Sequence, residues 1–341
     1  MYDVDEVISQ VPDVCRELED CWVSALIVVS TMRKRNYKPL FLNSYMYYDS
    51  SLRYENLQGF EKIIRKNIAI AEADRHDFEE DVEIECEFLK EFLGMNCTGK
   101  ASSGDDAEKY AKRMIAGKAS CILWMDTYLV PWNPMYKKIH FQHCTTIIEY
   151  GARECLVYDA LNSGNECFTV PTKELFNMTN YVSVICDCHS IIGQSDEQKQ
   201  VPYFVDKYMF RYNGIKKYIG AIQLFLRDLK DCSSAIIEDM EGQNEDIVKL
   251  MMRIFVNQYQ KCMKQYDIFD RSGRISEEDM IIFEELNNTW KSCGSLFAKI
   301  CFLSGEKRAK KFEDLCGKVS CIVELLGRIQ TNREMEMAGN M

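Results

Sequence analysis

Residues 20–29 read Asp-Cys-Trp-Val-Ser-Ala-Leu-Ile-Val-Val, and this stretch predicts a buried helix with a cysteine at its first position. Asp20 is a residue type that caps helix N-termini, and the residues that follow Trp22 are almost wholly apolar. The free N–H groups and the dipole at a helix N-terminus stabilise an anion. A thiol placed there can have a pKa of about 3.5–7.5 instead of about 8.5. The sequence therefore predicts that Cys21 is a nucleophile.

A second stretch predicts a β-hairpin that carries a histidine and an aspartate. Residues 141–150 and 155–158 are rich in β-branched and aromatic side chains, and a short turn separates them. If the turn is centred near Gly151, His143 and Asp159 lie opposite each other on one face of the sheet. A carboxylate at that position holds the imidazole in one tautomer and stabilises its cation. A pairing shift of one residue would instead put the two on opposite faces.

Composition excludes several classes of function. The 341 residues suffice for one large or two ordinary domains, and an apolar fraction of 47% supports a substantial core. Sixteen cysteines, with no export signal and no bilayer-length apolar run, predict a cytoplasmic protein with reduced thiols and no membrane partner. The net charge of −11 argues against nucleic acid as a partner. Basic clusters such as Arg33-Lys34-Arg35 are expected at solvated helix ends.

The fold class expected from these patterns is α+β, with a mixed N-terminal half and a helical C-terminal half. The polar, turn-forming residues 193–202 predict a boundary between a domain at 1–195 and a helical bundle at 200–341. In the first domain we expect helices at 59–74 and 78–93, a loop at 94–104, strands at 121–129 and 181–188, and a short helix from 171. In the second, apolar residues at helical spacing predict helices at 205–229, 233–266, 276–303 and 306–333.

Other polar residues offer alternatives. His140 competes with His143 for the role of base, although an offset of three places the two on opposite faces of a strand. His189 follows Cys186 and Cys188, but this spacing is too tight for an ordinary zinc site, so no metal is expected. A further set of residues either lines a substrate pocket or belongs to the core: Trp22, Asp126, Tyr128, Trp132, Tyr136 and His140.

These motifs have a family resemblance. The pattern Asp20-Cys21-Trp22-x-Ser-Ala-Leu26 resembles the nucleophile helix of papain-like, C39-type cysteine peptidases. His143, residues 145–151 and Val157-Tyr158-Asp159 resemble the His and Asp strands of that family. The longer pattern from Asp126 to Asp159 resembles the N-terminal domain of the butirosin biosynthesis H family, and amide-forming enzymes of closthioamide-type, thiotemplated pathways are similar. The resemblance covers roughly residues 10 to 190.

The resemblance implies a papain-like fold for the first domain, with Cys21, His143 and Asp159 as a catalytic triad. It implies an acyltransferase of nonribosomal antibiotic biosynthesis, which moves an acyl or peptidyl group from a carrier-protein thioester to a small amine. No cofactor is expected besides the phosphopantetheine arm delivered on the carrier protein. C39 peptidases have an oxyanion-binding Gln where this chain has Cys15, which favours an activated thioester over a peptide as substrate.

Two alternatives stay open on sequence alone. A cysteine peptidase or thioesterase would use the same three residues with water as the acceptor. A non-catalytic interaction protein would keep Cys21 as a small core residue, which is the usual role of a buried cysteine.

Overall fold

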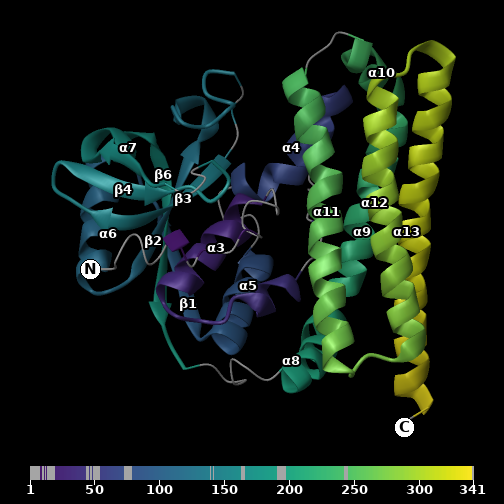
Figure 1. Ribbon diagram of the computed structural model, residues 1–341, viewed down its shortest axis with the longest axis horizontal. Coiled ribbons are helices and arrows are strands. Elements are labelled where there is room, and N and C mark those ends of the chain that lie inside the picture. Colours follow the sequence, from purple (N-terminus) through teal and green to yellow (C-terminus); the bar gives the residue numbers. More distant parts are fainter. Residues whose placement is uncertain are drawn as a thin grey trace. The chain divides into compact units, whose positions relative to one another are not determined.

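The computed structural model describes residues 8–9, 11, 13, 20–43, 46, 48, 54–72, 79–138, 140, 142–162, 166–189, 197–241 and 245–339. Helices combine with an antiparallel sheet, and the chain divides into two compact units (Figure 1). Unit 1 comprises Met1–Leu40 and Ala71–Asp196, and unit 2 comprises Phe41–Ile70 and Glu197–Met341. The expected mixture of helix and sheet, followed by a helical C-terminal region, is therefore present.

Unit 1 is built on a six-stranded sheet among the described residues, with all neighbouring strands antiparallel and in the order β1-β6-β2-β3-β4-β5. The strands are β1 (Met95–Ala101), β2 (Ser120–Asp126), β3 (Gln142–Tyr150), β4 (Glu154–Tyr158), β5 (Phe168–Pro171) and β6 (Thr179–Asp187). The helical elements are α3 (Cys21–Met32), α5 (Glu79–Phe88), η4 (Leu89–Leu93), α6 (Gly104–Ala116), η5 (Thr127–Leu129) and α7 (Thr172–Met178), and η1 (Lys38–Phe41) spans the sequence boundary with unit 2.

One face of the sheet packs against α6 and α7. Ala107 and Ala111 of α6, together with Leu175 and Phe176 of α7, join the alternate strand residues in one buried core. Alanines on α6 leave out bulky side chains, so this helix approaches the sheet closely. The other face carries Trp124 of β2, whose ring centroid lies 5.2 Å from that of Trp22 on α3. The sheet therefore separates α3 from α6 and α7.

Helix α3 begins and ends with specific side-chain contacts. At its start the Asp20 carboxylate accepts the backbone N–H of Val23 at 3.0 Å, which confirms the predicted cap. At its end Arg33, whose side chain is only 3% exposed, donates to Ser120 Oγ at 3.1 Å and to Asp187 Oδ2 at 2.6 Å. The expectation of a solvated basic cluster was wrong for Arg33, because strands β2 and β6 supply acceptors for its guanidinium. These contacts fix α3 on the sheet.

The stretch predicted as a loop at 94–104 is mostly a strand, and this prediction was wrong. β1 pairs with β6 over its whole length, from Met95 opposite Asp187 to Ala101 opposite Tyr181. Its sequence is polar because β1 is an edge strand with most side chains exposed. Gly99 belongs there because the Tyr181 ring lies where a β-carbon would be. A tertiary partner thus forms a strand that local propensity does not favour.

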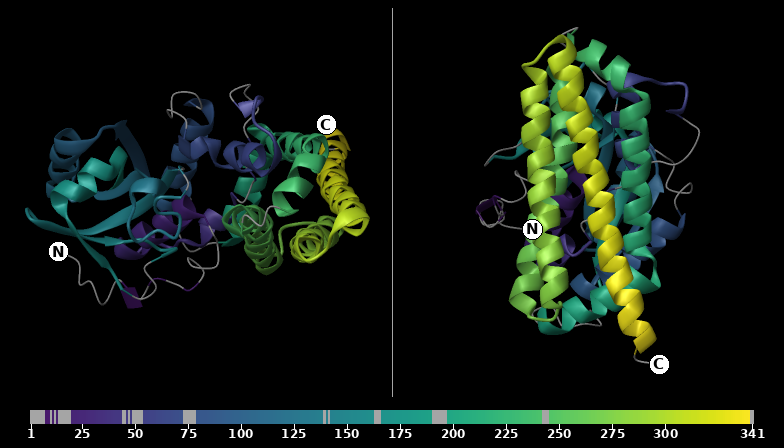
Figure 2. Two further views of the ribbon diagram at one scale, coloured as in Figure 1. Left: turned by 90° about the horizontal axis from the view of Figure 1, so that it is seen from above. Right: turned by 90° about the vertical axis from the view of Figure 1, so that its right-hand side faces the viewer.

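The secondary-structure elements described in unit 2 are all helices. Its elements are α4 (Gly59–Glu72, whose last two residues fall in unit 1), α8 (Glu197–Phe204), η6 (Val205–Arg211), α9 (Gly214–Asp231), α10 (Ser233–Glu241), α11 (Glu245–Ser272), α12 (Glu277–Cys301) and α13 (Gly305–Gly339). The helix expected at 205–229 is interrupted at Asn213, whose φ of 54° is left-handed. Figure 2 shows the long green-to-yellow helices of this unit running alongside one another. Within the described residues, no helix has the length and hydropathy required to cross a bilayer.

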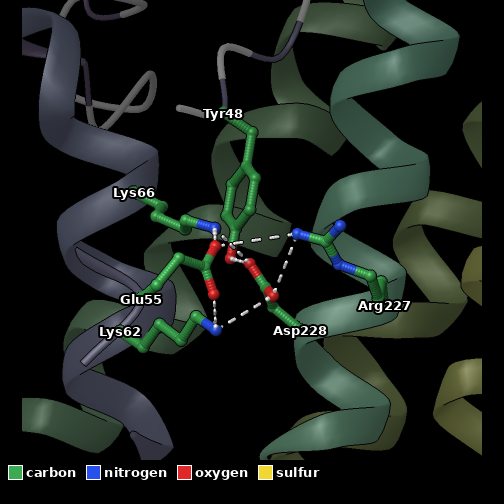
Figure 3. Close-up of polar contacts among 6 residues, drawn as sticks. All are labelled: Tyr48, Glu55, Lys62, Lys66, Arg227 and Asp228. Carbon is green, nitrogen blue, oxygen red and sulfur yellow. Dashed lines mark hydrogen bonds and ion pairs between the residues drawn. The ribbon is translucent and has the colours of Figure 1, made fainter. Parts of the chain in front are cut away.

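A cluster of charged side chains joins α4 to α9 inside unit 2 (Figure 3). We call it the lysine–carboxylate cluster; its members are Tyr48, Glu55, Lys62, Lys66, Arg227 and Asp228. Lys66 Nζ, which is fully buried, lies 2.6 Å from Glu55 Oε1 and 3.0 Å from Asp228 Oδ2. Lys62 Nζ lies 2.7 Å from Glu55 Oε2 and 3.4 Å from Asp228 Oδ1. The boundary predicted at 193–202 placed Phe41–Ile70 in the first domain, whereas the structure groups this segment with the helices of unit 2.

Candidate active site

Cys21 occupies the first position of α3, as the sequence predicted, and is partly exposed. Its pKa is lowered from 9.0 to about 6, chiefly because of a side-chain hydrogen bond with Cys144. Burial opposes this shift, and the hydrogen bond and charge of His143 add to it. The Cys21 side chain is therefore a thiolate at neutral pH.

His143 connects this sulfur to a carboxylate. Its Nε2 lies 2.6 Å from Oδ2 of Asp159, and both side chains are buried. Because Nε2 is taken, Nδ1 is the ring nitrogen left for the hydrogen bond with Cys21. Burial alone would lower the pKa of His143, but the Asp159 carboxylate and the Cys21 sulfur raise it to about 10. The two groups thus form a thiolate–imidazolium pair at neutral pH.

A β-bulge puts His143 and Asp159 on the same face of the sheet. Tyr158 pairs with Thr146, whereas Leu156 pairs with Glu149, so β3 carries one extra residue near Ile148. Asp159 follows Tyr158, which makes it a diagonal neighbour of His143. The sequence placed the two directly opposite each other, and that register was wrong by two residues. A shift of two residues keeps the side chains of His143 and Asp159 on the same face, so the predicted contact still forms. Without the bulge the shift would be odd, and the two side chains would lie on opposite faces.

Asp159 is held by several donors besides His143. Trp132 Nε1 donates to Oδ2 at 3.0 Å, and Asn162 Nδ2 donates to the same oxygen at 2.8 Å. The backbone N–H of Leu161 donates to Oδ1 at 3.1 Å. Burial would raise the pKa of Asp159, but the charge of His143 and these hydrogen bonds hold it below its usual value. The carboxylate is thus fixed in its ionised form. Sequence reasoning missed Asn162, whose only signal is its position three residues after Asp159.

The other predicted pocket residues have partners of their own. Asp126 Oδ2 lies 2.7 Å from Nδ1 of His140, and the His140 ring stacks on Tyr128 with 4.1 Å between the centroids. Trp22 Nε1 donates to Glu85. The Nζ of Lys137 lies 5.0 Å from the centroid of Tyr136. His140 therefore pairs with a different carboxylate from His143, and Trp132 bonds to Asp159 instead of only lining a pocket.

The sequence predicts neither a metal site nor disulfides. Within the described parts of the chain, no three His, Cys, Asp or Glu side chains converge as a metal site. The fifteen cysteines among the described residues are free thiols. Cys15, which stands where C39 peptidases have the oxyanion-binding Gln, lies outside the described residues. Among the described residues, the backbone N–H groups at the N-terminus of α3 are suited to bind an oxyanion.

The low pKa of Cys21 leads to a prediction for its alkylation by iodoacetamide. Because only the thiolate reacts, the rate should rise through a midpoint near pH 6 and stay high at neutral pH. Trypsin releases residues 17–33, in which Cys21 is the only cysteine, so mass spectrometry isolates this rate from that of the other thiols. The peptide 300–307 supplies an internal control, because burial raises the pKa of Cys301. A Cys21 midpoint near pH 9 would contradict the thiolate–imidazolium pair.

Comparisons with known proteins identify no family for this chain. No protein-family model matches it, and no curated protein matches its sequence. Among solved structures, a protein from Bacillus anthracis described as a C39-like peptidase aligns with a TM-score of 0.21 and 14% identity. The alignment covers 30% of this chain and 58% of that one, so the chain spans less than two thirds of that neighbour. The contacts described above are therefore the basis for inferring function.

Proposed function

We propose that this chain is a cysteine-dependent acyltransferase of the cytosol, with Cys21 as nucleophile, His143 as acid and base, and Asp159 as the group that orients His143. One observation supports this most strongly: a thiol at a helix N-terminus is hydrogen-bonded to an imidazole, which is hydrogen-bonded in turn to a buried carboxylate. A nucleophile, a base and an orienting group within reach of one another are the arrangement required for covalent catalysis. A papain-like fold for unit 1 belongs to this proposal.

The proposed reaction has two halves. The Cys21 thiolate attacks the thioester carbonyl carbon, and the carrier thiol leaves with a proton from the His143 imidazolium. The acyl group is then bound to Cys21 as a new thioester. The amine attacks this carbonyl, its proton passes to His143, and the Cys21 thiolate is expelled as the amide forms. The second half-reaction returns to His143 the proton that the first consumed, so the thiolate–imidazolium pair is regenerated. Backbone N–H groups at the start of α3 are suited to stabilise the oxyanion.

We infer that the acyl donor is a carrier-protein thioester and the acceptor a small amine. The motifs around Cys21 and His143 resemble those of amide-forming enzymes in thiotemplated, antibiotic-producing pathways, which supports this choice. A phosphopantetheine arm on the carrier protein would bring the acyl group to Cys21, and no resident cofactor takes part in the proposed chemistry. Peptide or thioester hydrolysis is the second candidate, because the contacts of Cys21 and His143 suit water as well as an amine.

The test is a reconstituted reaction. The purified chain is mixed with an acylated carrier protein and a panel of small amines, and an unacylated carrier serves as the control. We expect a mass increase equal to the acyl group on residues 17–33, followed by amide formation when amine is added. Free acid that accumulates despite saturating amine would replace the proposal by a hydrolase. If Cys21 takes up no acyl group and no product forms, the chain is better explained as an interaction protein.

A further inference from the structure

Cys144, the residue after His143 in β3, lies against the sulfur of Cys21. It pairs with Trp124 across the β2–β3 ladder, and the Trp124 ring lies 5.2 Å from that of Trp22, the neighbour of Cys21. The face of β3 that carries Cys144 is therefore the face covered by the first turn of α3. Cys144 is only 2% exposed, and its side chain is hydrogen-bonded to that of Cys21. The proposed chemistry assigns no role to this second thiol.

The direction of this hydrogen bond follows from the two protonation states. Burial, and then the contact with Cys21, raise the pKa of Cys144 well above its ordinary value, so Cys144 keeps its proton. The Cys21 sulfur, by contrast, lies at the N-terminus of α3 beside the His143 imidazole, where the helix dipole and the neighbouring cation both favour a thiolate. Cys144 S–H is therefore the donor and the Cys21 sulfur the acceptor. Other buried thiols of the chain are also protonated: burial raises the pKa of Cys121 and Cys293 to about 12.

We propose that Cys144 is a positioning residue for the nucleophile: its S–H group donates to the Cys21 sulfur and holds it beside the His143 imidazole. The thiolate then accepts one hydrogen bond from Cys144 and one from His143, which restricts the direction in which it can attack. This inference rests on the proposed role of Cys21. It adds a group that the sequence motifs around Cys21, His143 and Asp159 do not include.

A purely structural role for Cys144 makes the opposite prediction for two substitutions. If Cys144 only fills space, alanine should be tolerated better than serine, because a buried hydroxyl without a partner is unfavourable. If Cys144 is a donor to the thiolate, serine should preserve the function, because its O–H can replace the S–H, and alanine should not. The order of Cys144→Ser and Cys144→Ala therefore separates the two roles.

The readout is the pH dependence of Cys21 alkylation on residues 17–33, which requires no knowledge of the substrate. We expect Cys144→Ala to move the midpoint upward by about 1–2 pH units, which would slow alkylation at pH 6 by about 5- to 50-fold. Cys144→Ser should stay close to the unmodified chain. Cys144→Val is a second variant without a donor, of a residue type that suits a strand, if the alanine variant fails to fold. Cys121→Ala is the matched control, because Cys121 is a fully buried β2 thiol on the opposite face of the sheet, and should leave the midpoint unchanged.

The possible outcomes are distinct. A low midpoint in the unmodified chain that persists in the alanine and valine variants overturns the role of Cys144 and leaves the proposed function intact. Equal shifts in the serine and alanine variants also overturn it, because they indicate a change in packing. A midpoint near pH 9 in the unmodified chain removes the basis of the proposed function itself, and the role of Cys144 with it.

Discussion

A Cys21→Ala variant is expected to lose about 10⁴- to 10⁶-fold in acyl-transfer rate, the scale of loss when the nucleophile of a triad is removed. The physical reason is that the Cys21 sulfur is the only atom in the proposed reaction that forms and then releases the acyl bond. A methyl group at this position can do neither, and His143 is left without its acceptor. The measurement is the initial rate of amide formation from an acylated carrier protein with saturating amine, together with the loss of the acyl adduct on residues 17–33.

Cys301→Ala is the matched control for this experiment. Cys301 is a partly exposed thiol near the end of α12 in unit 2, and burial raises its pKa. Its removal should leave the rate of amide formation unchanged. If Cys21→Ala kept its rate within about tenfold of the unmodified chain, covalent catalysis by Cys21 would be excluded, since a loss that small corresponds to only about 1.4 kcal/mol of the barrier.

An Asp228→Asn variant is expected to lower the free energy of unfolding of unit 2 by about 3–5 kcal/mol, the usual effect of removing one partner from a buried ion pair. The asparagine has the same shape but no charge. Lys66 and Lys62 would then share Glu55 as the single carboxylate in the cluster, although the Lys66 side chain is fully buried. Tyr48, which donates to Asp228 Oδ2 at 3.0 Å, would also bond to a weaker acceptor. Urea unfolding followed by helical circular dichroism measures the change.

Asp231→Asn provides the control on the same helix. Asp231 is exposed at the end of α9, three residues after Asp228, so its neutralisation should change stability by less than about 0.5 kcal/mol. Both variants carry the same change in net charge, so a difference between them reports burial and not overall charge. Equal urea midpoints for Asp228→Asn and the unmodified chain would show that the lysine–carboxylate cluster does not stabilise unit 2.

The residues of the candidate site could be predicted from the sequence because each belongs to a local pattern. Asp20 and the apolar run after it specify the start of α3, and β-branched residues with a glycine turn specify the β3–β4 hairpin. The pairing of strands β3 and β4 could be predicted only in part. The bulge near Ile148 changes the register by one residue, and nothing in the alternation of side chains marks it. The predicted register was wrong by two residues. Because this is an even number, His143 and Asp159 still lie on the same face, and the predicted contact forms.

Asn162 and Cys144 could not be assigned from sequence. Asn162 reaches Asp159 through a turn whose geometry depends on the packing around it. Cys144 is one of sixteen cysteines in the sequence, and the donor role proposed for it depends on α3 lying over that face of β3. The contact of Cys144 joins residues more than 100 positions apart in the sequence, and that of Asn162 depends on the shape of a turn, so local patterns encode neither.

By itself, the sequence determined the elements whose formation is local: the capped apolar helix α3, the β3–β4 hairpin, and the helices of unit 2 that carry apolar residues at helical spacing. Tertiary structure decided what depends on a distant partner. β1 is a strand only because β6 offers it a ladder of hydrogen bonds, and Phe41–Ile70 joins unit 2 through contacts of Lys66 with Asp228. The physical reason is the same in both cases: a buried charge or an unpaired backbone group is stable only when a partner from elsewhere in the chain satisfies it.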